Sequence, residues 1–145
     1  MKMNRPRSAE RTQAAAQAPS LLVLAQPSSE TDDLLAPLVR RSDLCVLRVA
    51  SMQAAEMALR DVAVSLVLVC PETETRSVTA LLDRTDKLRP GIPVLALRPR
   101  GGHPPDWKGR AVGILHCPLL PDVLNRTVDV VLGLGARPKS RPGSS

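Results

Sequence analysis

The segment from Cys70 to Ser77 is the part of the chain whose residue types and spacing could perform a reaction. It reads CPETETRS, so five residues separate Cys70 from Arg76, and a serine follows the arginine. A cysteine thiolate in such a loop can attack the phosphorus of a phosphate ester, while backbone amides and an arginine hold the phosphoryl oxygens. The loop stands between an apolar run and a helical pattern, which would place its amides at a helix N-terminus. One hypothesis is therefore a thiol phosphatase that uses Cys70 and Arg76.

The same loop has features that oppose phosphate binding. Pro71 has no amide hydrogen, and Glu72 and Glu74 place negative charge where a phosphate would bind. The loop also lacks glycine, which a tightly wrapped backbone usually requires. We therefore favour a buried structural cysteine at the end of a strand and keep the cysteine-dependent phosphatase as the alternative.

Cysteine and histidine side chains could also converge on a metal ion. Cys70, His116 and Cys117 could meet at one edge of a sheet, and His103 would complete a ligand set that zinc accepts. The closely spaced ligand pairs that are typical of zinc sites are absent from the sequence. The sequence therefore favours ordinary side chains at these positions, with no metal and no other cofactor.

The cysteines also indicate a compartment. Cys45, Cys70 and Cys117 are odd in number and widely spaced, with no CxxC pair and no secretory hydrophobic segment before them. No apolar run approaches the roughly 20 residues that span a bilayer. We expect free thiols in a cytoplasmic protein.

The positive charge is confined to the two ends of the sequence. The chain has 145 residues and a formal charge of +6, of which residues 1–20 carry +3 and residues 134–145 carry +3, so the part between them is neutral. Basic tails could bind the phosphate groups of nucleic acid or of an anionic membrane surface. A nucleic-acid accessory protein is therefore a second alternative. Because each tail is only weakly basic, flexible solubilising ends are the favoured interpretation.

Alternating apolar runs and helical patterns organise the rest of the chain. Five runs predict strands at 21–25, 44–50, 64–69, 92–97 and 112–116. The gaps predict four helices. The first covers 29–41, with Ser29 as N-cap, and Pro37 should kink it or delay its start. The second follows the N-cap Ser51, the third carries Val78, Leu81, Leu82 and Leu88, and the fourth runs from Pro121 to the C-cap Gly133. Residues 98–111 contain Gly-Gly and Pro-Pro and predict a loop.

This alternation predicts an α/β fold with a doubly wound, five-stranded parallel sheet. We expect one domain over residues 20–133, with disordered basic tails at 1–19 and 134–145. Ligands of such sheets bind at the carboxyl ends of the strands, so a site is expected near residues 25–30, 70–76, 98–108 and 116–120.

Three segments resemble the receiver domain of bacterial response regulators, over about residues 20–133. VSLVLVCPE resembles the third strand of that family, GIPVLALRP resembles the fourth, and ILHCPLLPDVL resembles the fifth strand, the following Lys-Pro and the last helix. The resemblance implies a receiver-like, flavodoxin-like sheet in which the helix between the fourth and fifth strands is eroded to a loop.

The residues that carry the chemistry of the family have changed in this chain. The resemblance places the acidic metal-binding pair on Ala25 and Gln26, the phosphoaccepting aspartate on Cys70, the switch Thr or Ser on Arg98, and the Lys before a cis-prone proline on Cys117. Phosphoryl transfer to a carboxylate requires the carboxylate and a divalent cation. The resemblance therefore implies a degenerate receiver, a pseudo-receiver that is not an enzyme.

The rebuilt loop at 98–111 is the predicted partner surface. Arg98, Arg100, Lys108 and Arg110 form a local basic cluster that could hold an acidic partner, with solvated loop charge as the alternative. Trp107 is either a hydrophobic plug over the missing helix or an exposed interface anchor. We expect a phosphorylation-independent signalling module whose partner is a protein such as a kinase, a regulator or a polarity or motility complex.

Overall fold

Runs of Leu and Val form the strands of one parallel sheet, because strands that are covered on both faces can be apolar on both faces. The computed structural model describes residues 18–100, 107 and 112–134. The strands are β1 (Ser20–Leu24), β2 (Cys45–Val49), β3 (Leu66–Val69), β4 (Val94–Pro99) and β5 (Val112–Cys117). All neighbouring pairs are parallel, and the order across the sheet is β2-β1-β3-β4-β5. The predicted doubly wound α/β fold is confirmed.

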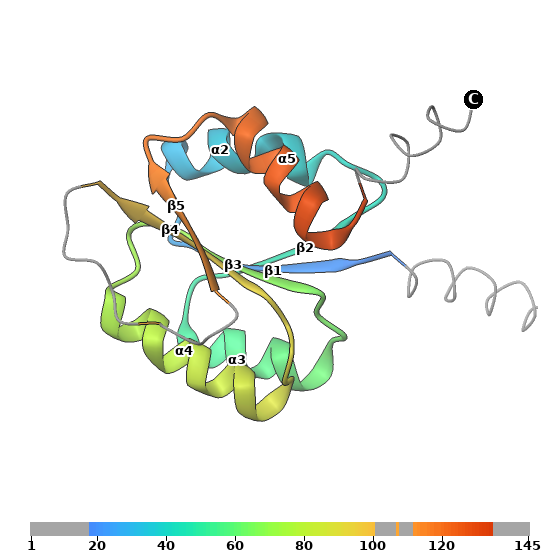
Figure 1. Ribbon diagram of the computed structural model, residues 1–145, viewed down its shortest axis with the longest axis vertical. Coiled ribbons are helices and arrows are strands. Elements are labelled where there is room, and N and C mark those ends of the chain that lie inside the picture. Colours follow the sequence, from blue (N-terminus) through green and yellow to red (C-terminus); the bar gives the residue numbers. More distant parts are fainter. Residues whose placement is uncertain (1–17, 101–106, 108–111, 135–145) are drawn as a thin grey trace, which may run out of the picture.

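Helices cover both faces of this sheet (Figure 1). They are α2 (Ser29–Val39), α3 (Met52–Asp61), α4 (Thr75–Leu88) and α5 (Pro121–Leu132). The pair α2 and α5 packs on one face, where Leu35, Leu38, Leu124 and Val128 are buried. The pair α3 and α4 packs on the other face, and each layer has its own apolar core.

The start of α2 differs from the prediction. The N-cap is Ser28 and not Ser29, because the Ser28 hydroxyl accepts a hydrogen bond of 3.1 Å from the amide of Thr31. Pro37 does not delay the helix, since α2 begins at Ser29 and includes Pro37 in its last turn. A proline so close to the end removes one helical hydrogen bond and leaves the preceding turns intact.

The ends of the other helices follow the sequence signals. Ser51 caps α3 by accepting a hydrogen bond from the amide of Ala54 at 3.1 Å. Pro121 occupies the first turn of α5, and Gly133 ends that helix with a φ of 75°, which favours glycine. The part of the chain that the structure describes has four helices, in agreement with an eroded helix between β4 and β5. Within the same part, no helix has the length and apolar character required to cross a membrane.

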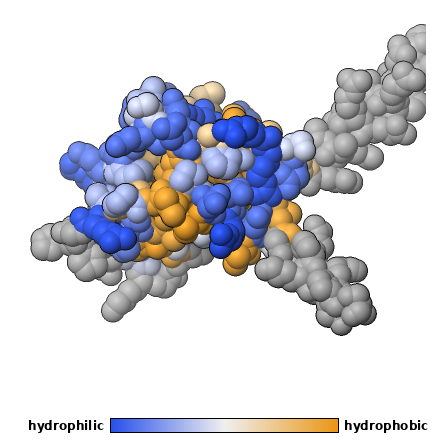
Figure 2. All heavy atoms as spheres, turned by 90° about the horizontal axis from the view of Figure 1, so that it is seen from above, coloured by the Kyte–Doolittle hydropathy of each residue, from blue (hydrophilic) through white to orange (hydrophobic). Residues whose placement is uncertain are grey.

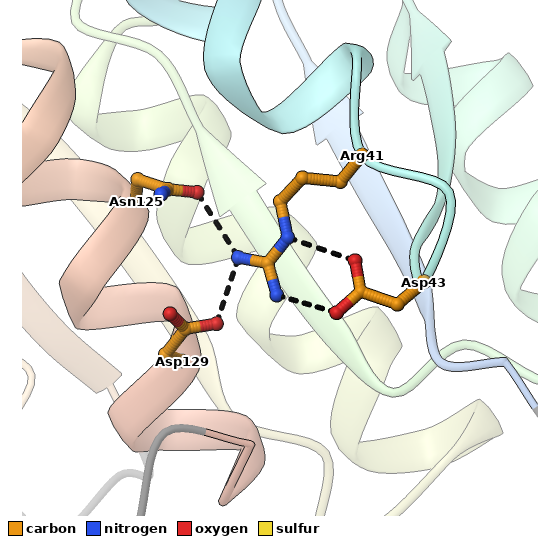
Figure 3. A network of polar contacts seen from close by, with 4 residues as sticks. All are labelled: Arg41, Asp43, Asn125 and Asp129. Carbon is orange, nitrogen blue, oxygen red and sulfur yellow. Dashed lines mark hydrogen bonds and ion pairs between the residues drawn. The ribbon is translucent and has the colours of Figure 1, made fainter. Parts of the chain in front are cut away.

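A polar network that the sequence patterns did not predict fastens α5 to the loop after α2 (Figure 3). The Arg41 guanidinium donates to both carboxylate oxygens of Asp43, at 2.9 and 2.8 Å. Its third nitrogen donates to Asn125 at 3.0 Å and pairs with Asp129 at 2.7 Å. These contacts raise the pKa of Arg41, with the hydrogen bond to Asp43 as the main cause. Arg41 therefore holds the position of α5 relative to the sheet.

Candidate functional site

The carboxyl edge of the sheet brings together the five positions to which the resemblance assigns the chemistry of receivers. Ala25 and Gln26 follow β1 and Cys70 follows β3, while Arg98 lies near the end of β4 and Cys117 ends β5. The order of the strands places β1, β3, β4 and β5 next to one another at this edge. The side chains at these positions decide what the edge can do.

Gln26, in the loop after β1, is engaged in hydrogen bonds through both its backbone and its side chain. Its backbone amide donates to a carboxylate oxygen of Glu72 at 2.6 Å, and its side-chain amide donates to the carbonyl of Ala50 at 2.8 Å. Arg48 donates to Asp32 at 2.6 Å and to the carbonyl of Gln26 at 3.2 Å. The loop after β1 is thus held by contacts within the protein.

Cys70 is completely buried at the end of β3, with a relative exposure of 0%. Burial raises the pKa of its thiol to about 12, and the negative charge of Glu72 acts in the same direction. A thiol with this pKa stays protonated at neutral pH, and the thiolate is the nucleophilic form. Arg76 is 88% exposed and pairs with Glu74 at 3.9 Å. A buried, protonated Cys70 and an exposed Arg76 that pairs with Glu74 do not favour the phosphatase hypothesis.

The high pKa of Cys70 predicts an alkaline loss of stability. An unfolded cysteine loses its proton near pH 8.5, whereas folded Cys70 keeps it to about pH 12. Between these values the unfolded state binds fewer protons, so the free energy of unfolding falls as the pH rises, by up to about 1.4 kcal/mol per pH unit. Urea unfolding of the wild type and of Cys70→Ala from pH 8 to 11 measures this, because the variant lacks the contribution. Parallel profiles, or rapid alkylation of Cys70 in the native protein at pH 8, would contradict the burial.

Arg98 anchors the loop between β3 and α4. Its guanidinium donates to the carbonyl of Thr73 at 2.7 Å and to the Thr75 hydroxyl at 3.1 Å. Burial lowers its pKa, while Cys117 acts in the opposite direction. Arg98 therefore has an internal role, which corrects its place in the predicted basic partner surface.

The sequence left two interpretations of Trp107 open, and the structure agrees with the first, a hydrophobic plug. Its ring is 5% exposed and belongs to the core between the sheet and the α3–α4 layer. The indole nitrogen donates to the hydroxyl of Thr79 in α4 at 2.8 Å. Trp107 is therefore not an exposed anchor. Of the other members of the predicted surface, Arg100 is exposed, and Lys108 and Arg110 lie outside the described residues.

Cys117 ends β5 as a half-buried free thiol, and the peptide bond to Pro118 is cis, at the position where the resemblance implied a cis-prone proline. Burial raises the pKa of Cys117. His116 is exposed, and His103 lies outside the described residues. Among residues 18–100, 107 and 112–134, no three His, Cys, Asp or Glu side chains form a group that could hold a metal ion.

A cleft of about 860 Å³ opens beside the closed strand ends. Two leucines and four prolines supply apolar wall, and the acidic side chains of Glu30, Asp33 and Glu72 line the same space. A site near residues 25–30 and 70–76 was expected from the sequence, but its acidic lining was not, because Asp33 and Glu72 are distant in the sequence and come together only in the fold. The signal was available, since a helix that follows β1 in such a fold begins at the carboxyl edge.

An exposed apolar stripe runs along α5. Leu120, which caps the helix, is 69% exposed, Val123 is 39% exposed and Val130 is 75% exposed. Val123 and Val130 are seven residues apart, which places them on one side of the helix. Figure 2 looks onto the layer of α2 and α5 and shows apolar surface between hydrophilic regions. We call Leu120, Val123 and Val130 the α5 stripe.

Comparisons with known proteins identify the fold. No protein-family model matches the chain, and no curated protein matches it in sequence. Its structure is similar to a response regulator from Thermotoga maritima, with a TM-score of 0.64 and 21% identity over 80% of this chain and 98% of that chain. For the receiver domain of the hybrid histidine kinase CckA, the TM-score is 0.61, with 16% identity over 78% of this chain and 98% of that chain.

A response regulator receiver domain protein from Methanospirillum hungatei JF-1 is also similar, with a TM-score of 0.63 and 14% identity over 81% of this chain and 96% of that chain. At these identities the likeness establishes the fold, which is that of a receiver domain.

Proposed function

We propose that the chain is a degenerate receiver that binds a protein partner in signal transduction and needs no phosphorylation to do so. The observation that carries the proposal is the full burial of Cys70, the residue to which the resemblance assigns the position of the phosphoaccepting aspartate. A protonated thiol there can neither accept a phosphoryl group as a carboxylate does nor help to hold a divalent cation.

The neighbouring positions support the same conclusion. Gln26 and Arg98 replace residues that would contact a metal or a phosphoryl group, and both are engaged by backbone carbonyls. A receiver that is switched by phosphorylation needs these positions free to respond. We infer that the carboxyl edge stays in one state and that the signal resides in binding.

The α5 stripe is the surface that we assign to the partner. Large side chains of this kind are usually buried, and three of them exposed along one helix form an apolar patch of the type found at protein interfaces. The network around Arg41 fixes α5 and presents the stripe in a defined position. The partner that fits it is a protein with an apolar surface of its own, such as a kinase, a regulator or a polarity or motility complex.

The double variant Val123→Glu/Val130→Glu tests this assignment. Two charges placed on the stripe would be desolvated in the complex, so we expect partner binding to weaken about tenfold or more. The measurement is quantitative capture of the native partner on the immobilised full chain, with Met57→Glu as the matched control. Met57 is 54% exposed on α3, on the opposite face of the sheet, so this variant should bind like the wild type.

Two outcomes would contradict the assignment. One is equal capture by the wild type and the double variant, and the other is an equal loss with Met57→Glu. Light scattering of the purified protein distinguishes a second copy of the chain from a different partner, because self-association through the stripe would raise the molar mass of the wild type alone.

A further inference from the structure

The cleft at the carboxyl edge has a charge opposite to that of a phosphate site. Glu30, Asp33 and Glu72 line it, and none of its described lining residues is basic. Arg48 and Arg98, on strands that end at this edge, are engaged elsewhere, because Arg48 donates to Asp32 and Arg98 donates to Thr73. A phosphorylated ligand would meet only negative charge here, whereas an ammonium or guanidinium group would be attracted.

The rest of the cleft indicates that the cation belongs to a peptide. Leu34, Leu119 and the prolines give it more apolar than polar surface, and its volume of about 860 Å³ exceeds what a single ion needs. Glu72 also holds the Gln26 amide, which leaves Glu30 and Asp33 as the side chains for a cationic ligand. A short segment in which basic residues alternate with apolar ones suits both the acidic and the apolar side chains of the cleft.

We propose that the cleft binds the N-terminal segment of this same chain, residues 1–17. This segment carries Lys2, Arg5, Arg7 and Arg11 against one acidic residue, and Met1, Met3 and Pro6 alternate with the first cations. Its net charge of +3 is opposite in sign to that of the cleft, where Glu30 and Asp33 remain for a cationic ligand. The contact would cover the carboxyl edge of the sheet, where the resemblance assigns the phosphorylation site, with part of the protein itself.

The length of the segment permits the contact. The described chain begins near the amino end of β1, so the cleft lies at least the five residues of β1 away, about 17 Å along the sheet. Arg7 is 11 residues from Ala18 and can extend to about 36 Å, and Lys2 is 16 residues away and can extend to about 53 Å. Three of the four cations can therefore reach the cleft even on an indirect path.

The basic C-terminal segment fits less well. It leaves the described fold after α5, and the 12 residues of α5 separate that point from the cleft by about 18 Å. Arg141 is seven residues beyond Leu134 and reaches about 23 Å only when fully extended, and Arg137 and Lys139 reach less. A tethered N-terminal segment also acts at an effective concentration in the millimolar range, so weak individual contacts suffice.

Amide chemical shifts of the full chain test the proposal. The test variant is Lys2→Gln/Arg5→Gln/Arg7→Gln, and the matched control is Arg137→Gln/Lys139→Gln/Arg141→Gln, which removes the same charge from the other end. We expect the test variant to shift the amide signals of residues 28–34 and 119–122 and the control to leave them unchanged. Raising the salt to about 0.5 M should produce the same shifts in the wild type, because the pairs are exposed.

A reciprocal variant completes the test. Glu30→Gln/Asp33→Asn should move the signals of residues 1–11 to their positions in high salt, while the signals of α3 and α4 stay in place and report an intact fold. The proposal is overturned if the N-terminal variant leaves the cleft signals unchanged and the cleft variant leaves the signals of residues 1–11 unchanged. It is also overturned if the C-terminal control shifts the cleft signals equally, or if the shifts depend on protein concentration. The cleft adjoins the α5 stripe at Leu120, but Val123 and Val130 are not among its lining residues, so the two proposals are tested by different variants and can fail independently.

Discussion

Replacing Trp107 with alanine is expected to lower the free energy of unfolding by about 3–5 kcal/mol, the range for removing a large buried aromatic side chain. The ring is 5% exposed and packs in the core with Val78, Leu82 and Val94. The substitution also removes the hydrogen bond from the indole to Thr79. Because single domains are stable by about 5–15 kcal/mol, this is a large fraction of the total. Urea unfolding followed by circular dichroism measures the change.

Two milder variants separate the ring from its hydrogen bond. Thr79→Val removes the acceptor and should cost about 1 kcal/mol, since the indole nitrogen then lacks its partner. Trp107→Phe should fall between Thr79→Val and Trp107→Ala. Wild-type fluorescence gives an independent check, because Trp107 is the single aromatic residue of the chain. A loss below about 1 kcal/mol for Trp107→Ala would show that the ring does not cover the core.

The second large effect is expected for Arg41→Met, which should lower the free energy of unfolding by about 2–3 kcal/mol. The Arg41 side chain is 18% exposed and joins Asp43, Asn125 and Asp129. Removing it leaves the partly buried carboxylate of Asp129 without its cation, and hydrogen bonds to charged groups contribute about 1.5–3 kcal/mol. Thermal and urea unfolding measure the loss, with Arg40→Met as the control for an exposed arginine.

The pH dependence of this difference identifies its cause. The hydrogen bond from Arg41 holds the pKa of Asp43 below its usual value. A carboxyl group with a lowered folded pKa contributes stability above its unfolded pKa and loses it as the pH falls through the folded pKa. The advantage of the wild type over Arg41→Met should therefore shrink below about pH 4. An advantage that is constant down to pH 2 would assign the effect to packing alone.

The fold was accessible from the sequence because its strongest signals are local. β3 consists of Leu66–Val69, which is buried on both faces and identifies itself by continuous apolar character. Gly133 and Ser51 end and begin helices through interactions within a few residues. The start of α2 was misplaced by one residue, because Ser28 and Ser29 are equivalent as caps until the backbone shows which hydroxyl reaches the amide of Thr31.

The site was less accessible because its contacts join distant parts of the chain. Gln26 and Glu72 are 46 residues apart, and Arg41 and Asn125 are 84 residues apart, so no periodicity reveals either pair. Arg98 has the charge expected for a partner surface, and only its position relative to Thr73 shows that it holds a loop. For Trp107 the sequence allowed two environments, and the contact of its indole ring with Thr79 of α4 decides between them.

A phosphorylation assay tests most directly the central claim that this chain, with its receiver fold, binds a partner without aspartyl-phosphate chemistry. The full chain is incubated with acetyl phosphate and Mg²⁺, and its intact mass is recorded beside that of a receiver that retains the acceptor aspartate. We expect phosphorylation of that control only, with unchanged capture of the partner by this chain. Phosphate bound to this chain, together with a change in partner binding, would show that aspartyl-phosphate chemistry or an equivalent reaction controls binding.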